Sequence, residues 1–277
     1  MKSIIFTLAT SLLVSAAAHA QNFEKLFYKD LTKETNEVTL TVDNAVSTPA
    51  ETKFKFKVTN KTNDYIIYKP VESKFIINGK EVKPSEKTLI IRPNESDFVT
   101  INLKGTGYNA IKNYSFVVDG IYTVSTNGKT ITVPNFKLPA SQNEFKAGDF
   151  NCAMTNVSKE TGKTEVKFKC SYNGDKIGVI HNTRAGVKMP DGNEYANAKK
   201  PGLLDSKAKE VLVMKGEEES VNLKWDRMEG GKAMDMQKVP MDIVWNATFT
   251  EAPAVKVKGE TMELEFDETT TTAKNKK

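Results

Sequence analysis

Two cysteines, Cys152 and Cys170, carry the most reactive side chains of this chain. Thiols outside the reducing cytosol pair most simply as one disulfide. A hairpin around Thr161 places each cysteine nine residues from the turn, directly opposite the other and within the reach of a disulfide. The spacing lacks the close Cys-x-x-Cys arrangement that lowers a thiol pKa in redox enzymes. The pair therefore predicts a structural cross-link.

Methionines gather in one stretch of the second half, at Met228, Met234, Met236 and Met241. Thioether sulfur is a soft ligand that suits Cu(I), and Met-x-Met spacing in a loop could present two sulfurs to one ion. His181 could complete such a site. The favoured interpretation is that these methionines are flexible hydrophobes that fill gaps beneath a loop. We therefore expect no cofactor, with a periplasmic Cu(I)-binding protein as an alternative.

Few catalytic sets fit the chain, because His181 is the only histidine beyond the first twenty residues. A Ser-His-Asp triad would have to include it, and no Gly-x-Ser-x-Gly elbow supplies the nucleophile. One histidine does not meet the ligand demand of a catalytic zinc site. We expect His181 to be a half-buried strand residue. Carboxylate pairs for glycoside hydrolysis are assembled only by the fold, so an envelope-polymer hydrolase with unidentified carboxylates stays an alternative.

A row of lysines alternates with apolar residues in the run KFKFKV at residues 53–58. Period two is typical of a half-buried strand, with the apolar side chains on one face and Lys53, Lys55 and Lys57 on the other. The favoured interpretation is that the lysines protect a sheet edge from pairing with other chains. The same lysine face could instead bind an anionic surface or a glycan.

Residues 1–20 have the pattern of a secretory signal peptide. Lys2 gives a positive start, an apolar run follows, and Ala18-His19-Ala20 forms a small-x-small cleavage site. The apolar run is shorter than the roughly 20 residues of a membrane span, so an uncleaved anchor is the lesser alternative. No later stretch approaches that length, and we expect a periplasmic or secreted protein without an integral membrane segment after cleavage.

The composition excludes several classes of protein. The 277 residues are 39% hydrophobic and 27% charged, unlike a disordered, collagen-like, cysteine-dense or multi-span membrane chain. Removing Lys2 with the leader leaves 39 basic against 35 acidic residues, a net charge of +4. Only Arg92, Arg184 and Arg227 are arginines, whereas phosphate and guanine recognition relies on arginine forks. We expect no nucleic-acid partner.

Short alternating runs separated by turn signals continue from residue 37 to residue 139. Asn78-Gly79 and Asn127-Gly128 lie between such runs, and Asn-Gly suits the type I′ turn of a hairpin tip. The pattern then recurs, because residues 165–170 align with residues 53–58 at an offset of 112. The recurrence favours a duplication, although two unrelated sandwiches would share the same alternation.

The two copies each have about seven or eight short strands, the size and rhythm of an immunoglobulin-like sandwich. We predict an all-β chain with a cleaved signal peptide at 1–20 and two tandem immunoglobulin-like antiparallel β-sandwich domains, at 21–139 and 140–268. A disordered polar tail is expected at 269–277. A single large barrel or jelly roll is the alternative architecture.

The signal peptide, the duplicated β pattern and the missing catalytic sets favour a non-enzymatic protein. We expect an extracytoplasmic binding or structural module that contacts an envelope or extracellular protein or a glycan. Its sandwich faces, strand edges and loops are the surfaces available, and strand addition at an edge is a natural mode for such a fold.

Overall fold

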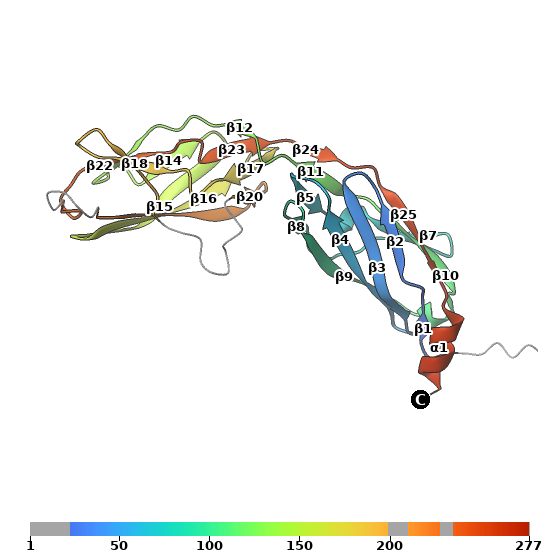
Figure 1. Cartoon of the computed structure of the whole chain (residues 1–277). Helices are drawn as coiled ribbons and strands as arrows, with labels where there is room; N and C mark the ends of the chain where they lie inside the picture. The colour runs from blue at the N-terminus through green and yellow to red at the C-terminus, as the bar shows by residue number, and fades with distance from the viewer. Residues whose placement is uncertain (1–22, 199–209, 228–234, 277) are drawn as a thin grey trace, which may run out of the picture.

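The computed structural model describes residues 23–198, 210–227 and 235–276 (Figure 1). Within them the chain is all-β apart from two 3-10 turns and one short helix, α1 (Glu268–Asn275). No helix of this part is long and apolar enough to cross a membrane. The predicted signal peptide at 1–20 lies outside the described residues.

The strands form two lobes that lie end to end (Figure 1). The first lobe contains residues 23–124 and 254–276, and the second contains residues 129–252. All strand pairs are antiparallel. Each lobe encloses its own apolar core, built from residues that alternate along the strands and point inward. The lobes are therefore consistent with β-sandwiches.

The first lobe has one main sheet and two smaller ones. The main sheet comprises β1 (Leu26–Phe27), β2 (Leu31–Glu34), β3 (Val38–Ser47), β4 (Glu51–Asn60) and β9 (Ser96–Lys104). One smaller sheet comprises β6 (Lys74–Ile77), β7 (Lys80–Val82), β10 (Asn113–Val118) and β25 (Glu260–Glu265). The other comprises β5 (Tyr65–Tyr68), β8 (Leu89–Ile91), β11 (Ile121–Val124) and β24 (Ala254–Lys256).

The second lobe repeats this plan strand by strand, except that β1 has no counterpart among the described residues. Its main sheet comprises β14 (Glu144–Ala147), β15 (Phe150–Glu160), β16 (Lys163–Tyr172) and β21 (Glu218–Asp226). One smaller sheet comprises β13 (Phe136–Leu138), β18 (Gly186–Lys188), β19 (Glu194–Ala196) and β22 (Met241–Val244). The other comprises β12 (Lys129–Thr130), β17 (Ile177–Ile180), β20 (Val211–Val213) and β23 (Phe249–Ala252). β16 begins 112 residues after β4, the offset seen in the sequence.

The lobes exchange their last strands. β12 and β13 follow β11 in the chain but pair with β23 and β22 of the second lobe. β24 and β25 follow β23 but pair with β11 and β10 of the first lobe. The registers correspond, because Met262 faces Phe116 in the first lobe and Phe136 faces Ile243 in the second. Each lobe is therefore completed by the other half of the chain.

This exchange corrects the predicted domain boundaries. The chain crosses between lobes at residues 125–128 rather than at 139 and 140, and residues 254–268 belong to the first lobe instead of the second. Two contiguous domains were expected because alternation along a strand shows which residues are buried but not which lobe they complete.

The two Asn-Gly pairs have different outcomes. Asn78 and Gly79 have φ angles of 50° and 75° between β6 and β7, which confirms the predicted hairpin tip. The prediction for Asn127-Gly128 is wrong, because this pair lies where the chain passes from β11 to β12. A Cβ on Gly128 would lie 2.5 Å from the carbonyl oxygen of Glu251, so glycine here permits the close approach of two backbones.

The C-terminal residues form helix α1, so the predicted disordered tail is wrong for residues 269–276. The side chain of Asp267 caps the helix by accepting a hydrogen bond from the N–H of Thr270 at 2.9 Å. The buried Thr271 Oγ1 accepts from the N–H of Phe27 at 2.9 Å. Ala273 is the tail's one apolar residue, but the polar side chains of Thr271 and Asn275 bond to backbone groups of Phe27 and Lys25 and thereby join the helix to β1 and the residue before it.

An apolar cluster joins the lobes at the crossing. Its buried members are Tyr65, Ile67, Val124, Ile177, Leu212 and Ala252. The hydroxyl of Tyr65 also donates to the carbonyl oxygen of Glu210 at 3.3 Å. The junction therefore consists of two continuous chain crossings and a shared core, rather than a single flexible linker.

Candidate functional site

The disulfide lies at the centre of the second lobe's main sheet. Cys152 of β15 faces Cys170 of β16 with a Cα–Cα distance of 4.0 Å, and the two sulfurs are bonded. Both residues are buried. The prediction of a cross-strand structural disulfide is confirmed.

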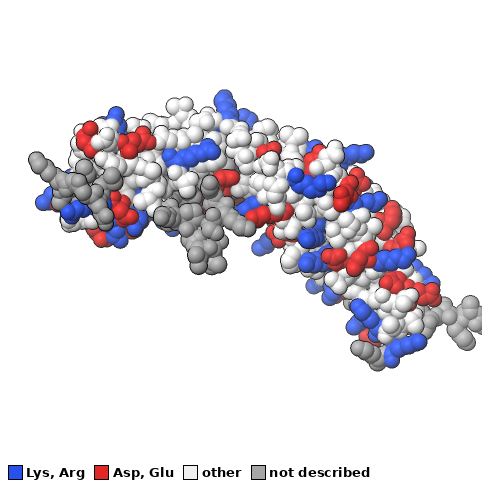
Figure 2. Space-filling view, in the orientation of Figure 1, with Lys and Arg blue, Asp and Glu red and all other residues white. Residues whose placement is uncertain are grey.

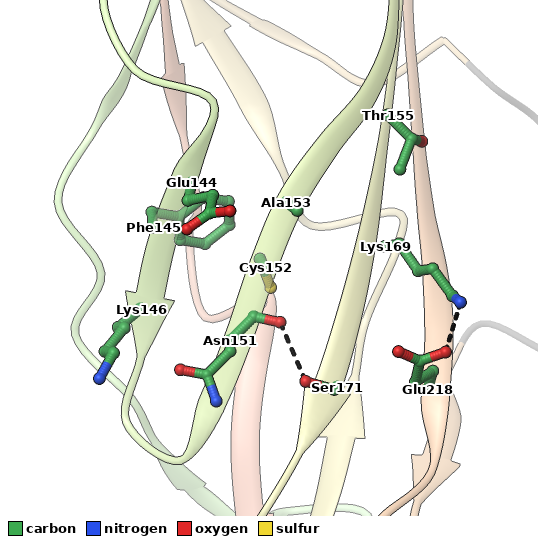
Figure 3. Close-up of a pocket in the computed structure, with 10 residues that line it drawn as sticks. All are labelled: Glu144, Phe145, Lys146, Asn151, Cys152, Ala153, Thr155, Lys169, Ser171 and Glu218. Carbon is green, nitrogen blue, oxygen red and sulfur yellow. Dashed lines mark hydrogen bonds and ion pairs between the residues drawn. The ribbon is translucent and has the colours of Figure 1, made fainter.

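A shallow groove of about 410 Å³ lies over the outer face of this sheet. Figure 3 shows its lining, which comes from four strands. The residues are Glu144, Phe145, Lys146, Asn151, Cys152, Ala153, Thr155, Lys169, Ser171 and Glu218. Successive side chains of a strand point to opposite faces, so the polar members stand on the outer face while Phe145 and Cys152 belong to the core beneath.

The groove exists because its floor is made of small residues. Ala153 on β15 and Ser171 on β16 occupy positions that correspond, 112 residues apart, to Thr41 and Thr59 of the first lobe. Ser171 Oγ donates to the carbonyl oxygen of Asn151 at 3.5 Å, which ties the floor to the sheet. Short side chains between longer neighbours leave a hollow that a ligand could enter.

The rims of the groove carry charges of both signs. Glu144 and Lys146 project from β14, and an ion pair joins Lys169 of β16 to Glu218 of β21 (Figure 3). Two lysines and two glutamates make the rims neutral overall. Figure 2 likewise shows basic and acidic side chains mixed over the face it presents, without a large area of one sign. The groove is therefore suited to a polar ligand rather than to a polyanion.

The lysine row lies on a different kind of strand from the one predicted. β4 runs between β3 and β9 in the main sheet of the first lobe, so Lys53, Lys55 and Lys57 stand on a central strand and the edge-protection interpretation is wrong. Lys55 Nζ lies 4.0 Å from the ring centroid of Phe98, whose side chain is 52% exposed. Binding of an anionic surface or glycan to this lysine face stays a prediction.

His181 is a buried residue just after β17. Its backbone N–H donates to the carbonyl oxygen of Thr248 at 2.7 Å, and its ring Nε2 lies 3.2 Å from Thr250 Oγ1. Burial, with a smaller contribution from the charge of Arg184, lowers its pKa from 6.5 to about 4. The imidazole is neutral near pH 7 and forms part of the second lobe's packing.

The methionine cluster is divided by its surroundings. Met236 and Met241 are both buried in the core of the second lobe. Met228 and Met234 lie outside the described residues. Within the described part of the chain, no group of three or more His, Cys, Asp or Glu side chains could hold a metal ion. The two described methionines are placed as hydrophobes in a core rather than as free ligands in a loop.

No model of a protein family matches the chain. A search of the curated proteins finds no match either. The chemistry of the groove therefore follows from its own residues.

The groove residues were not found by sequence reasoning. Ala153, Asn151 and Ser171 belong to no motif, and their placement side by side depends on the register between β15 and β16. The available signal was the small outward residue Ser171 at the end of β16, whose other outward residues are lysines and a glutamate, together with Ala153 on β15.

Proposed function

We propose that this protein is a non-enzymatic extracytoplasmic binding module, built from two immunoglobulin-like sandwiches and exported by the signal peptide at 1–20. Its contact surface is the groove over the second lobe, and its partner is an envelope protein or a glycan. The single observation that carries the proposal is this groove, whose small floor and neutral polar rims lie on a sheet held by a disulfide.

The chemistry of the lining supports a polar partner. Asn151 supplies an amide, Thr155 and Ser171 supply hydroxyls, and the rims supply both ammonium and carboxylate groups. Such a set can donate and accept hydrogen bonds at several points, as the hydroxyls of a glycan or the backbone of a peptide require. The disulfide supports a location outside the reducing cytosol.

The test is cross-linking capture from native cell envelopes with three forms of the mature chain. Ala153→Phe fills the floor of the groove with a ring on the outer face of the sheet. Thr41→Phe places the same ring at the corresponding position of the first lobe, because Thr41 faces Lys57 as Ala153 faces Lys169. It is therefore the matched control.

We expect the wild type and Thr41→Phe to capture the same component, and Ala153→Phe to lose it while keeping the folded circular dichroism spectrum. Capture that is equal in all three forms would place the contact elsewhere. Failure of the wild type to retain any envelope component would contradict the binding function itself.

A further inference from the structure

The edge of the first lobe's main sheet is covered by β1. Leu26 faces Ser47 and Phe27 faces Val46 along the last residues of β3. The N–H of Tyr28 continues this ladder by donating to the carbonyl oxygen of Ala45 at 3.1 Å. Ala45 and Ser47 are consequently buried. β1 is a short strand that the segment before β2 adds to an existing sheet.

The second lobe has the same edge without the added strand. β14 covers β15 from Phe150 to Ala153, and no strand of the described residues pairs with the open side of residues 157–160. The connectivity explains this difference. Only five residues separate β13 from β14, so the segment that precedes β14 is tied to β13 and does not continue along β15.

Val157, an exposed residue of this edge, points toward the core side of the sheet. Val157 faces the buried Val166 across β15 and β16, yet Val157 itself is 43% exposed. Its exposure follows from the absence of a neighbour on the open side among the described residues. A core-facing valine that is left half in water favours the addition of a further apolar group.

The backbone at this edge has hydrogen-bonding groups directed outward. The short 4.0 Å Cα separation of Cys152 and Cys170 marks a non-hydrogen-bonded pair of the β15–β16 ladder. Val166 and Thr164 lie an even number of residues from Cys170 along β16, so the pairs that they form with Val157 and Lys159 are of the same type. The N–H and C=O groups of Val157 and Lys159 therefore point away from β16.

We propose that the edge of β15 at residues 157–160 takes an extended segment of a partner protein, which adds antiparallel to β15 as β1 adds to β3. This inference rests on the proposed binding function and names a second contact, separate from the groove. The main-chain ladder supplies affinity, and the side chains opposite Val157 and Lys159 supply selection.

The partner segment must differ from β1 in two side chains. Val157 and Lys159 are larger than Ala45 and Ser47, their counterparts in the first lobe, so the added strand has less room than Tyr28 and Leu26 occupy. A carboxylate opposite Lys159 gives an opposite-charge cross-strand pair, and a β-branched residue suits Val157. Lys159 Nζ donates to the carbonyl oxygen of Val239 at 2.6 Å, which holds the cation beside this edge.

The probe is a labelled peptide of residues 23–30 carrying Leu26→Glu and Tyr28→Val, titrated against the mature chain by fluorescence anisotropy. Val157→Pro removes one outward N–H and blocks the ladder, whereas Val157→Thr keeps it and is the matched control. We expect saturable binding that Val157→Pro weakens about tenfold or more and Val157→Thr leaves nearly unchanged. The bound peptide should also slow amide exchange of Val157 and Lys159.

A charge exchange tests the side-chain selection. Lys159→Glu should weaken the binding of this peptide about fivefold, and a second peptide with Leu26→Lys should bind that variant better than it binds the wild type. Binding that survives Val157→Pro would overturn the proposal. The absence of saturable binding would overturn it as well. In that case the bulge before Val157 and the inward Lys159 would serve to protect the edge from pairing.

The two proposals fail separately. An envelope component captured through Ala153 together with no peptide binding would overturn only the edge contact. Peptide binding at Val157 together with no captured component would overturn the envelope contact of the groove and leave the edge contact standing.

Discussion

The two lobes have one strand plan but hold their main sheets together in different ways. In the first lobe Leu40 faces Val58, and at the positions 112 residues later Cys152 faces Cys170. The first lobe also has β1 and helix α1, which tie its edge strand to the C-terminal segment. We call β1 together with α1 the terminal clasp. The second lobe has no such clasp among its described residues but has the disulfide, so the same backbone plan is stabilised by packing in one lobe and by a covalent cross-link in the other.

The outer faces of the same sheets differ in side-chain size. The first lobe has Thr41 and Thr59 where the second has Ala153 and Ser171, and the smaller pair forms the floor of the groove. The backbone plan therefore does not decide where a ligand binds. A few outward-facing residues do.

The largest effect should come from the exchanged strands. Met262→Ala removes buried side-chain volume from the first lobe, and Phe136→Ala does so in the second. The free energy of unfolding should fall by about 2 to 5 kcal/mol for Met262→Ala and by about 3 to 5 kcal/mol for Phe136→Ala. Amide exchange should rise in β10 for Met262→Ala and in β22 for Phe136→Ala. Faster exchange in β22 for Met262→Ala and in β10 for Phe136→Ala would mean that each half of the chain keeps its own last strand.

The disulfide should contribute to the second lobe alone. Replacing Cys152 and Cys170 by Leu and Val, the residues of the first lobe at these positions, should lower the stability of the second lobe by about 3 kcal/mol through the loss of loop closure. Both tryptophans, Trp225 and Trp245, lie in the core of the second lobe, so urea unfolding followed by their fluorescence reports this change. An unchanged midpoint would show that packing replaces the cross-link fully.

His181 should make the second lobe sensitive to acid. The pKa of His181 is about 4 in the folded chain, below its ordinary value of 6.5. As the pH falls below 6.5, the imidazole is therefore protonated in the unfolded chain while it stays neutral in the folded chain. The stabilising contribution is present above pH 6.5 and is lost toward pH 4.

Between pH 7.5 and pH 5 we expect a loss on the order of 2 kcal/mol, since one pKa unit corresponds to about 1.4 kcal/mol. His181→Gln should remove this part of the pH dependence of the tryptophan-detected urea midpoint. A variant that keeps the full slope would assign the acid sensitivity to other groups.

The smallest expected effect concerns the terminal clasp of the first lobe, β1 with α1. Asp267→Ala removes the cap of α1 and should cost about 1 kcal/mol locally. Exchange of the Phe27 and Thr271 amides should accelerate while β15 and β16 stay unaffected. Equal acceleration in both lobes would show that the clasp stabilises the whole molecule.

The sequence was sufficient for the all-β class, the strand that carries the lysine row and the disulfide. The predicted pairing of Cys152 with Cys170 is correct because two departures from the predicted hairpin cancel each other. The turn of the β15–β16 hairpin has two residues rather than the odd number assumed, and a bulge between Met154 and Asn156 restores the register. Without the bulge, Cys152 would face Ser171.

The features that could not be predicted are those set by long-range pairing. Asn127-Gly128 has the chemistry of a hairpin turn, but tertiary pairing extends the chain there into the other lobe. The threonines at 269–272 resemble a solvated tail in sequence, because the partner of the buried Thr271 is Phe27, 244 residues earlier in the chain. The groove depends on which side chains of four strands stand together, and local patterns do not contain that information.

The most direct test of the central claim is a hydrogen-exchange comparison of the two main sheets in the presence of solubilised envelope material. We expect added protection in residues 144–155 and 169–171 of the wild type, none in the corresponding residues 32–43 and 57–59, and loss of the added protection in Ala153→Phe. Protection confined to the first lobe, or added protection that is unchanged in Ala153→Phe, would contradict a binding site in the groove.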